Sequence, residues 1–555
     1  MFEDLDLNAI HEENARELIK RLLNLIEQLS ADLRDARAEI QRLRDEVNRL
    51  KGEQGKPKIK ENKPAVPAGN YSSEKERHKS KRHGKRSKKA EIHIDREEVV
   101  KLDRSKLPAD AEFKEYVDVV VQDIRLETDN VRYWVEKRYS ASANKTYQAE
   151  LPRGYAGQFG PGIKAFIPAL YFGMGASEPK IQELLRYVGI RISEGEISNL
   201  LIKGKEDLHA EADAVYEAGL RSSFWQHTDD TATRVNGVNQ HCHVMCNPVY
   251  TSYHTLPNKD RLSVLDVLRN GRPRRFLLNQ EALDLLESVP LSQAVRQTLQ
   301  TCRNEIEMDE QTFQQSLKAW LPNLGERQSK IINVAAAIAS YHTEIDWPVI
   351  LILVCDDAPQ FRWLTHAIML CWVHAGRPYK KLLPVIPLHR EMLDNFLTRF
   401  WNYYDQLLEY KKQPTPAESA RLEAEFDALF SPCTGYDQLD KRITITRANK
   451  ASLLLVLKYP ELPLNNNPAE LGGRQRVRKR DTSFGPRTQE GRKAWDTFMT
   501  LAETAKKLDV SFYAYLHDRI TGTNAIPPLA ELVTKAAKEL NLGQGGLPPD
   551  LPPTY

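Results

Sequence analysis

An unbroken heptad repeat near the start of the chain is its most constraining feature. Apolar residues recur with alternating spacings of three and four, and neither Gly nor Pro interrupts them: Ile19, Leu22, Ile26, Leu29, Leu33, Ala36, Ile40, Leu43, Val47 and Leu50. Four of the five a positions are β-branched and four of the five d positions are Leu, which favours a parallel two-stranded coiled coil. We expect residues 1–51 to dimerise through the large members of this stripe. The alternative is a single amphipathic helix packed on its own domain.

The charges of the chain are segregated along the sequence. The 555 residues contain 79 Lys and Arg against 76 Asp and Glu, for a formal net charge of only +3. Residues 75–89, however, hold nine basic residues and one acidic residue, and residues 471–493 hold eight and two. Such runs commonly contact phosphate without reading base sequence. Near-neutrality overall therefore does not argue against a nucleic-acid partner.

We expect DNA contacts from basic residues in both regions. The alternative for residues 75–89 is a solvated linker without a partner. The predicted DNA-binding residues in these regions are Lys79, Lys81, Arg82, Lys85, Arg86, Arg474, Arg476, Arg478, Lys479 and Arg480. Arg377, outside both regions, is also predicted to bind DNA.

Cysteine usage and hydropathy indicate a reduced, intracellular protein. The six Cys include no Cys-x-x-Cys pair, which argues against a disulfide framework or a zinc ribbon. The acidic start MFEDLDLN lacks the features of a secretion signal, and the longest apolar run, residues 347–355, is too short to span a bilayer. We expect a cytoplasmic protein with no membrane partner.

Composition and periodicity divide the chain into several units. A Lys-, Pro-, Gly- and Ser-rich segment at 52–90 indicates a flexible basic linker, and alternating apolar residues predict a small β domain at 91–152. Residues 153–218 are predicted to be helical. Residues 219–520 form the large remaining unit, with helical insertions expected near 259–345 and 386–430, and 521–555 are expected to be a C-terminal tail.

A helix-turn-helix is one interpretation of the segment at 179–203. An apolar helix ends at Gly189, and Ser193 can cap a second helix that carries Ile197 and Leu201. This layout is that of a DNA-reading motif. An ordinary helical corner has the same pattern, and Glu194 and Glu196 do not suit a phosphate-facing surface.

Three carboxylates stand where a metal site can form. Asp229 lies in a predicted strand, and Asp356 follows the apolar run PVILILVC, which is typical of a strand buried on both faces. Glu470 follows Asn467 and Pro468 at the start of a predicted helix. Hard oxygen ligands suit Mg²⁺ or Mn²⁺, and a pair of such ions activates phosphodiester chemistry.

Each carboxylate also has a structural interpretation. The two aspartates can cap turns, and Glu470 fits a capping box with Asn467 as the cap. The basic helix after Glu470 favours the metal site facing a nucleic-acid backbone. Cys371 and His374 have the chemistry of zinc ligands, but no further ligand is identifiable, so no zinc is predicted.

Three segments resemble the DDE transposases of the insertion-sequence-66 family. They are HTDDTATRV at 227–235; CDDAPQF followed by CWVHAGRPYKKL at 355–382; and NNNPAE, RKRDTSFG and the helical block EGRKAWDTFMTLAETAKKLDVSFYAYLHDRI, within 465–520. The similarity runs from roughly 150 to 520. The family's leucine-zipper start is also matched. Residues 52–220 contain no Cys, so the family's Cys-rich zinc module is not expected, and the chain resembles a divergent member.

The resemblance implies an α/β core of RNase H-like type, in which helices flank a mixed sheet and helical insertions interrupt the core. Outside the core, the expected units are an N-terminal parallel coiled coil, a small β unit and a helical DNA-binding region. Asp229, Asp356 and Glu470 then take the metal-binding catalytic positions, with two Mg²⁺ or Mn²⁺ ions. It also implies hydrolytic nicking at transposon ends, followed by transfer of the freed 3′-hydroxyl into target DNA. The partners are transposon-end and target DNA at the nucleoid and a second copy of the chain, with accessory proteins of the same element left open.

Two other functions stay open at this stage. One is a catalytically silent or domesticated DNA-binding regulator derived from a transposase. The other is an RNase H-like nuclease that cuts DNA without strand transfer.

Overall fold

The computed structural model describes residues 11–51, 92–103, 108, 111–155 and 157–542. The five linker residues predicted to bind DNA, which are Lys79, Lys81, Arg82, Lys85 and Arg86, lie outside the described residues. No helix in the described part of the chain is long and apolar enough to cross a membrane.

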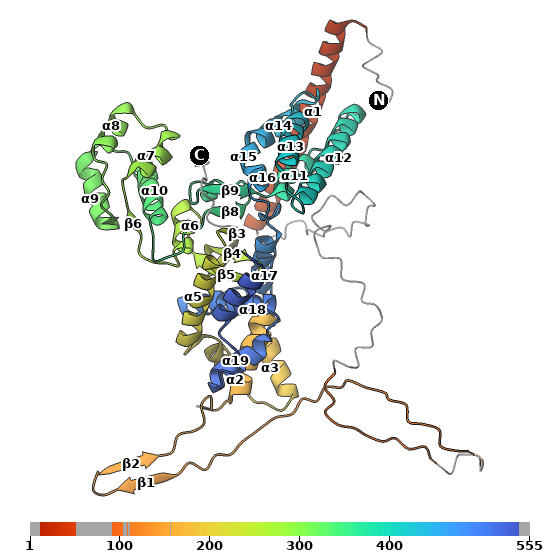
Figure 1. Cartoon of the computed structure of the whole chain (residues 1–555), viewed down its shortest axis with the longest axis vertical. Helices are drawn as coiled ribbons and strands as arrows, with labels where there is room; N and C mark the ends of the chain where they lie inside the picture. The colour runs from red at the N-terminus through yellow and green to blue at the C-terminus, as the bar shows by residue number, and fades with distance from the viewer. Residues whose placement is uncertain (1–10, 52–91, 104–107, 109–110, 156, 543–555) are drawn as a thin grey trace.

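A five-stranded mixed sheet forms the centre of the molecule (Figure 1). The strand order is β5-β4-β3-β8-β9. The three strands of this sheet that come first in the chain, β3 (Trp225–Val235), β4 (Val238–Asn247) and β5 (Tyr250–Leu256), pair successively in antiparallel order. Strand β8 (Ile352–Cys355) pairs in parallel with β3, and β9 (Ala367–Leu370) pairs in parallel with β8. The two-residue turn Asn236-Gly237 has positive φ at both positions, which is the geometry that a tight β3–β4 hairpin requires. The expected α/β core with a mixed sheet is confirmed.

Helices cover both faces of the sheet. On one face lies α17 (Asn467–Ser483), and the hydroxyl of Tyr253 donates to its Gly472 carbonyl at 3.2 Å. Helix α18 (Gln489–Lys507) covers the edge strand β5, whose Thr251 and Tyr253 N–H groups donate to hydroxyls of α18. On the other face lies α5 (Glu206–Arg221), whose Tyr216 ring contacts the rings of Tyr250 and His254. Because successive strand residues point to opposite faces, alternate residues of β3 to β5 meet different helices.

Two helical segments interrupt the strand sequence of the sheet. Between β5 and β8 stand α6 (Arg261–Leu268), β6 (Arg275–Phe276), α7 (Gln280–Glu287), α8 (Gln293–Thr301), β7 (Met308–Asp309), α9 (Glu310–Trp320) and α10 (Glu326–His342). Between β9 and α17 stand α11 (Trp372–Lys380), α12 (Pro387–Tyr410), α13 (Pro416–Leu429), α14 (Asp437–Ala448), α15 (Lys450–Leu453) and α16 (Leu455–Lys458). A short helical turn, η6 (Pro359–Phe361), joins β8 to β9.

The segments that flank the core differ in part from the expectations. In the described residues, the β domain expected at 91–152 is reduced to one hairpin, β1 (Lys137–Ser140) with β2 (Lys145–Gln148). The alternating valines Val117, Val119 and Val121 are 72–80% exposed, so no second strand covers them. Before the core come α2 (Pro161–Pro168), the π-helical turn η5 (Ala169–Gly173), α3 (Glu178–Tyr187) and α4 (Glu194–Ile202), and after it α19 (Phe512–Thr521).

The C-terminal tail expected from residue 521 contains a packed helix. Helix α20 (Leu529–Glu539) contacts α5, and it buries Leu529, Val533 and Ala537. These three residues are spaced by four and therefore lie on one helical face. This part of the expected C-terminal tail is therefore a helix that packs on the rest of the chain.

The N-terminal helix α1 (Glu13–Leu50) uses one face to dock on the body. Leu23 is buried, and the buried Glu27 carboxylate accepts backbone N–H groups of Val385 at 2.9 Å and Ile386 at 2.7 Å. Ile386 precedes the first residue of α12, so the Glu27 carboxylate satisfies the N-terminus of that helix. Asn24 donates to the Gly435 carbonyl and accepts the backbone N–H of Asp437, the first residue of α14.

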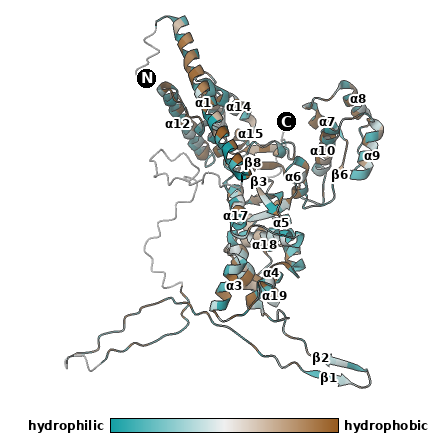
Figure 2. Ribbon diagram, turned by 180° about the vertical axis from the view of Figure 1, so that it is seen from behind, coloured by the Kyte–Doolittle hydropathy of each residue, from teal (hydrophilic) through white to brown (hydrophobic). Residues whose placement is uncertain are grey.

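The heptad stripe of α1 lies on a different face and remains exposed. Apolar residues continue along the part of α1 that projects beyond the body (Figure 2). The exposed stripe consists of Leu22, Leu29, Leu33, Ile40, Leu43, Val47 and Leu50, which are 47–78% exposed, while Ile19 and Ile26 are half-buried. The helix is thus packed on its own chain and still presents an apolar seam.

Close packing of α17 on the sheet gives a test of the fold. A Cβ on Gly472 would lie 2.8 Å from a methyl group of Val244, whereas a Cβ on Gly473 would meet its nearest neighbour, a carboxylate oxygen of Asp229, at 3.9 Å. Both Gly→Ala changes gain about 1 kcal/mol of helix propensity. Overpacking costs about 1–3 kcal/mol and applies only at Gly472. We therefore expect Gly472→Ala to lower the free energy of unfolding measured with urea, and Gly473→Ala to raise it. Equal effects of the two substitutions would contradict this packing.

Candidate metal-binding and nucleic-acid site

Strand register places Asp229 beside Asp356. The parallel ladder between β3 and β8 ends with His227 opposite Val354. Two residues further on, Asp229 is still in β3 and Asp356 is the first residue after β8, so the two aspartates stand at the same level. Adjacent strands are about 4.8 Å apart, and residues two apart share a face. The two carboxylates are therefore neighbours on the face that α17 covers.

The second acid of each motif has other partners. Asp230 accepts a hydrogen bond from the Gln360 side chain at 2.8 Å, and Lys259 lies 3.6 Å from its other oxygen. Asp357 is paired with Arg362. Of each acidic pair, it is the first member that faces α17.

The start of α17 is tied to the strand that carries Asp229. The helix begins at Asn467, and the side-chain amide of Asn466 donates to the Thr228 carbonyl at 2.8 Å while its oxygen lies 3.0 Å from Nδ1 of His227. Burial lowers the pKa of His227 to about 3, so the ring is neutral and Nδ1–H donates. The alternative interpretation of Glu470, a capping box with Asn467 as the cap, is not met, because the helix begins at Asn467 and the Asn467 N–H donates to the Asn465 side chain. Glu470, one turn into the helix, has its carboxylate available for other partners.

Helix α11 supplies the partners of Glu470. Arg377 donates to one carboxylate oxygen of Glu470 at 2.7 Å, and Nδ1 of His374 lies 3.3 Å from the other. Arg377 also donates to Nε2 of His374. Cys371, His374 and Arg377 are spaced by three and therefore share one side of α11. Arg377, which is predicted to bind DNA, thus contacts Glu470 in the structure, and so does His374, for which the sequence identifies no partner. The regular spacing of these residues was the available signal.

The three carboxylates act on one another electrostatically. Burial, together with the charges of Asp356, Asp230 and Glu470, raises the pKa of Asp229 to about 7. Moreover, Oε1 of Glu470 is buried and makes no hydrogen bond, although Nδ1 of His374 lies 3.3 Å away. Oxygen donors that repel one another and retain free lone pairs fit a hard divalent cation such as Mg²⁺ or Mn²⁺.

A softer group of possible ligands overlaps this site. Atoms of Cys371, His374 and Glu470 lie within 4.8 Å of one another. However, Sγ of Cys371 accepts the backbone N–H of Asn466, and burial raises the pKa of the thiol to about 11. Nε2 of His374 accepts from Arg377, which leaves Nδ1 as the N–H that faces Glu470. In this arrangement Cys371, His374 and Glu470 hold the first turn of α17 against α11.

The basic residues of α17 fall into two sets. Arg474 and Arg478 are exposed, and they follow Glu470 at intervals of four, so they extend along the same side of the helix. Arg480 is half-buried and donates to the Ala232 carbonyl at 2.6 Å. The exposed pair therefore forms a positive path that leads from the carboxylates.

The other set is buried, which corrects the expected DNA contacts. Arg476 donates to the Thr255 hydroxyl at 2.8 Å and pairs with Asp496. Lys479 donates to the Ala176 carbonyl at 2.8 Å and lies over the Tyr171 ring. Arg476 is fully buried and Lys479 is 3% exposed, so the prediction that they bind DNA is wrong.

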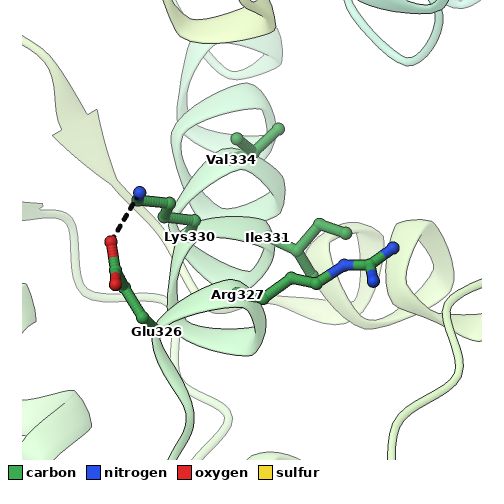
Figure 3. A pocket seen from close by; sticks show the side chains of 5 residues that line it. All are labelled: Glu326, Arg327, Lys330, Ile331 and Val334. Atoms are coloured by element: carbon green, nitrogen blue, oxygen red, sulfur yellow. Dashed lines mark ion pairs between the residues drawn. The ribbon is translucent and has the colours of Figure 1, made fainter.

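A shallow pocket on α10 lies apart from these groups. It is lined by Glu326, Arg327, Lys330, Ile331 and Val334, and Glu326 pairs with Lys330 at 2.6 Å (Figure 3). All five residues come from one exposed side of a single helix. The carboxylate site, which Asp229, Asp356 and Glu470 form, contributes no side chain to the pocket, so the pocket is not a continuation of that site.

Known proteins resemble this chain in the region of the site. The model of the family described as "Transposase IS66 family" matches residues 350–494, a range that contains Asp356, α11 and Glu470. An uncharacterized protein of Sinorhizobium fredii, y4jO, is 34% identical over 324 residues, which are 58% of this chain and 99% of that protein. No solved structure matches the chain.

Burial of Lys479 gives a stability test with a defined pH dependence. Burial lowers the pKa of Lys479 to about 7, so folding must desolvate an ammonium group at acidic pH. The unfolded chain keeps this proton up to a pKa of about 10.4, so the penalty shrinks as pH rises from about 7 towards that value. We expect Lys479→Met to raise the free energy of unfolding by about 1–3 kcal/mol at pH 6, after the lost hydrogen bonds are subtracted.

The expected gain falls steadily when urea unfolding is repeated up to pH 9.5. The exposed neighbour gives the control, because Arg478→Met should change stability little at any pH. A gain for Lys479→Met that is constant with pH would contradict a buried ammonium group.

Proposed function

Because the chain belongs to the IS66 transposase family, we propose that it is a DNA transposase in which Asp229, Asp356 and Glu470 bind divalent cations and catalyse phosphoryl transfer. The observation that carries the proposal is the convergence of these three carboxylates from β3, the end of β8 and the first turn of α17. The catalytic core is proposed to be of RNase H-like type, as the strand order and the parallel addition of β8 and β9 to an antiparallel trio support.

Two divalent ions at this site would activate the attacking oxygen and stabilise the leaving oxygen. The residues of the chain prepare the site for them. Asp229 and Asp356 present oxygens from rigid neighbouring strands, while Arg377 and His374 hold the carboxylate of Glu470. Arg474 and Arg478 would contact phosphates of the bound DNA, which their exposure on the same side of α17 as Glu470 supports.

The proposed reaction has two steps. First, water attacks a phosphodiester at the transposon end, the bond to the 3′ oxygen breaks, and a 3′-hydroxyl is released. This hydroxyl then attacks a phosphodiester of target DNA in line, and the displaced target 3′ oxygen takes up a proton. No covalent enzyme intermediate is required. The DNA partners are therefore transposon ends and target DNA.

Substitution of single carboxylates tests the catalytic assignment. We expect Asp229→Asn, Asp356→Asn and Glu470→Gln each to reduce strand transfer by at least about a hundredfold, since even changes behind metal ligands cost about 10–100-fold. DNA binding should persist. The neighbouring changes Asp230→Asn and Asp357→Asn serve as controls, because those carboxylates have partners outside the site. Both should retain activity, measured as joined donor–target product with Mg²⁺ or Mn²⁺.

The same experiment separates the alternatives. A regulator derived from a transposase would bind DNA without cutting it, and a nuclease would cut DNA without forming joined product. Mn²⁺ binding measured by calorimetry without DNA adds a readout that does not depend on activity. Unchanged Mn²⁺ affinity in all three variants would remove the metal-site assignment.

We also propose that two copies of the chain pair through α1. The support is its exposed apolar seam, since seven large residues of the heptad stripe stay 47–78% exposed although the helix is docked through another face. Facing g and e positions would then pair Asp32 with Arg37 and Glu39 with Arg44 of the second copy. A dimer would place two catalytic sites near the two ends of one DNA element.

Lysine substitution on the seam tests this pairing. We expect the double variant Leu29→Lys, Leu43→Lys to weaken dimerisation by at least about a hundredfold, because each dimer loses four buried leucines. The double variant Gln28→Lys, Gln41→Lys adds the same charge on exposed positions beside the seam and should remain dimeric. Sedimentation equilibrium over a concentration series gives the affinities. Equal dissociation of the two double variants would contradict pairing through the seam.

A further inference from the structure

A second cluster of metal-ligand side chains lies away from the carboxylate site. It consists of Glu281 in α7, His342 at the end of α10 and His366 just before β9. One ligand atom from each lies within 4.8 Å of the others. The cluster therefore joins two helices of the segment between β5 and β8 to the loop that leads into the edge strand of the sheet.

The hydrogen bonds of His342 fix which of its nitrogens faces the cluster. Nε2 lies 3.1 Å from the Leu364 carbonyl, and because a carbonyl only accepts, Nε2 carries the proton. In the neutral ring, Nδ1 then has a lone pair, and it lies 2.5 Å from a carboxylate oxygen of Glu281. Two acceptors at this distance require a proton between them, and a cation can take its place only if the carboxylate moves outward. The His342 side chain is only 4% exposed.

The surroundings of Nδ1 match those of a metal-bound histidine. A ligating imidazole commonly donates its second N–H to a backbone carbonyl, which orients the ring and makes the ligand more basic. The His366 ring stacks on that of His342 with centroids 4.6 Å apart and an angle of 28° between the rings, so a second imidazole borders the same space. Two imidazoles and a carboxylate are typical ligands of zinc and related d-block ions, whereas Mg²⁺ prefers oxygen ligands alone.

We propose that Glu281, His342 and His366 bind a divalent d-block cation such as Zn²⁺, with water completing the coordination. The ion would cross-link α7, α10 and the loop before β9. That loop begins at Asp356 and ends at His366, so the cation would fix the end of the loop opposite to the carboxylate site. The proposal does not depend on the transposase function. Binding requires Glu281, which is 26% exposed, to move outward so that the ion fits between it and His342.

Metal titration of the full chain tests this site. Protein freed of metal with a chelator is titrated with Zn²⁺ by calorimetry and with Co²⁺ by absorption spectroscopy. We expect Co²⁺ bound at this cluster to show d–d bands without sulfur-to-metal charge transfer, because no cysteine takes part. Glu281→Gln and His366→Gln should each weaken Zn²⁺ binding by at least about tenfold.

Cys371→Ser is the matched control, since it removes the sulfur of the other group of possible ligands. It should leave the Zn²⁺ affinity and the Co²⁺ spectrum unchanged. Sulfur charge transfer in the parent, or Zn²⁺ binding lost only in Cys371→Ser, would overturn the proposal. So would parent protein that binds no Zn²⁺, which would leave His342 and Glu281 as a protonated imidazole–carboxylate pair. If a glutamine variant does not fold, the parent Co²⁺ spectrum still excludes the Cys371 group, and a Zn²⁺ affinity that is unchanged in Asp229→Asn separates this cluster from the carboxylates of Asp229, Asp356 and Glu470, whereas loss of binding in Asp229→Asn overturns the proposal.

Discussion

The parallel pairing of β3 with β8 is the constraint on which the site depends. Its last ladder pair, His227 with Val354, sets Asp229 and Asp356 side by side, because both lie two residues beyond it on the same face. A slip of one residue would turn one aspartate towards α5 and away from α17. The register is supported by burial, since all four residues of β8 are buried. The chemistry thus depends on an apolar strand with no reactive group of its own.

Helix α17 completes the site because it lies unusually close to the sheet. Because residue 472 is glycine, α17 has no side chain there that would collide with Val244. Asn466 links the start of the helix to β3 through hydrogen bonds to Thr228 and His227. These contacts fix the height of the first turn and therefore the position of Glu470. The carboxylate itself is held from the other side by Arg377 and His374 of α11. Positioning is divided between two helices that are about 90 residues apart in sequence.

Much of the core could be predicted from the sequence, because its signals are local. The apolar run before Asp356 predicts a buried strand, the Asn236-Gly237 pair marks a hairpin, and Asn467-Pro468 marks a helix start. Strand register and the partners of Glu470 could not be predicted, since they depend on residues distant in sequence. The strands expected near Val119 do not form, for a related reason. Alternating apolar residues show which side of a strand could be buried, but they do not show that another strand packs beside it.

In the basic run of α17, composition alone does not show which residues are exposed, because the helical period decides which side of the helix each one lies on. Gly472, Arg476 and Lys479 follow one another at spacings of four and three, so all three lie on the face that packs against the protein. Glu470, Arg474 and Arg478 follow at spacings of four and lie on the accessible side.

A glycine pair in a helix indicates close approach, so the helical period counted from Gly472 separates the two sets without a structure. Counted this way, the segment keeps a strongly basic composition, but among the basic residues of α17 only the arginines that share a side with Glu470 are exposed. The buried cations serve α17 instead, through Asp496 for Arg476 and the Ala176 carbonyl for Lys479. The same run of charge therefore both anchors the helix and lines the path to its carboxylate.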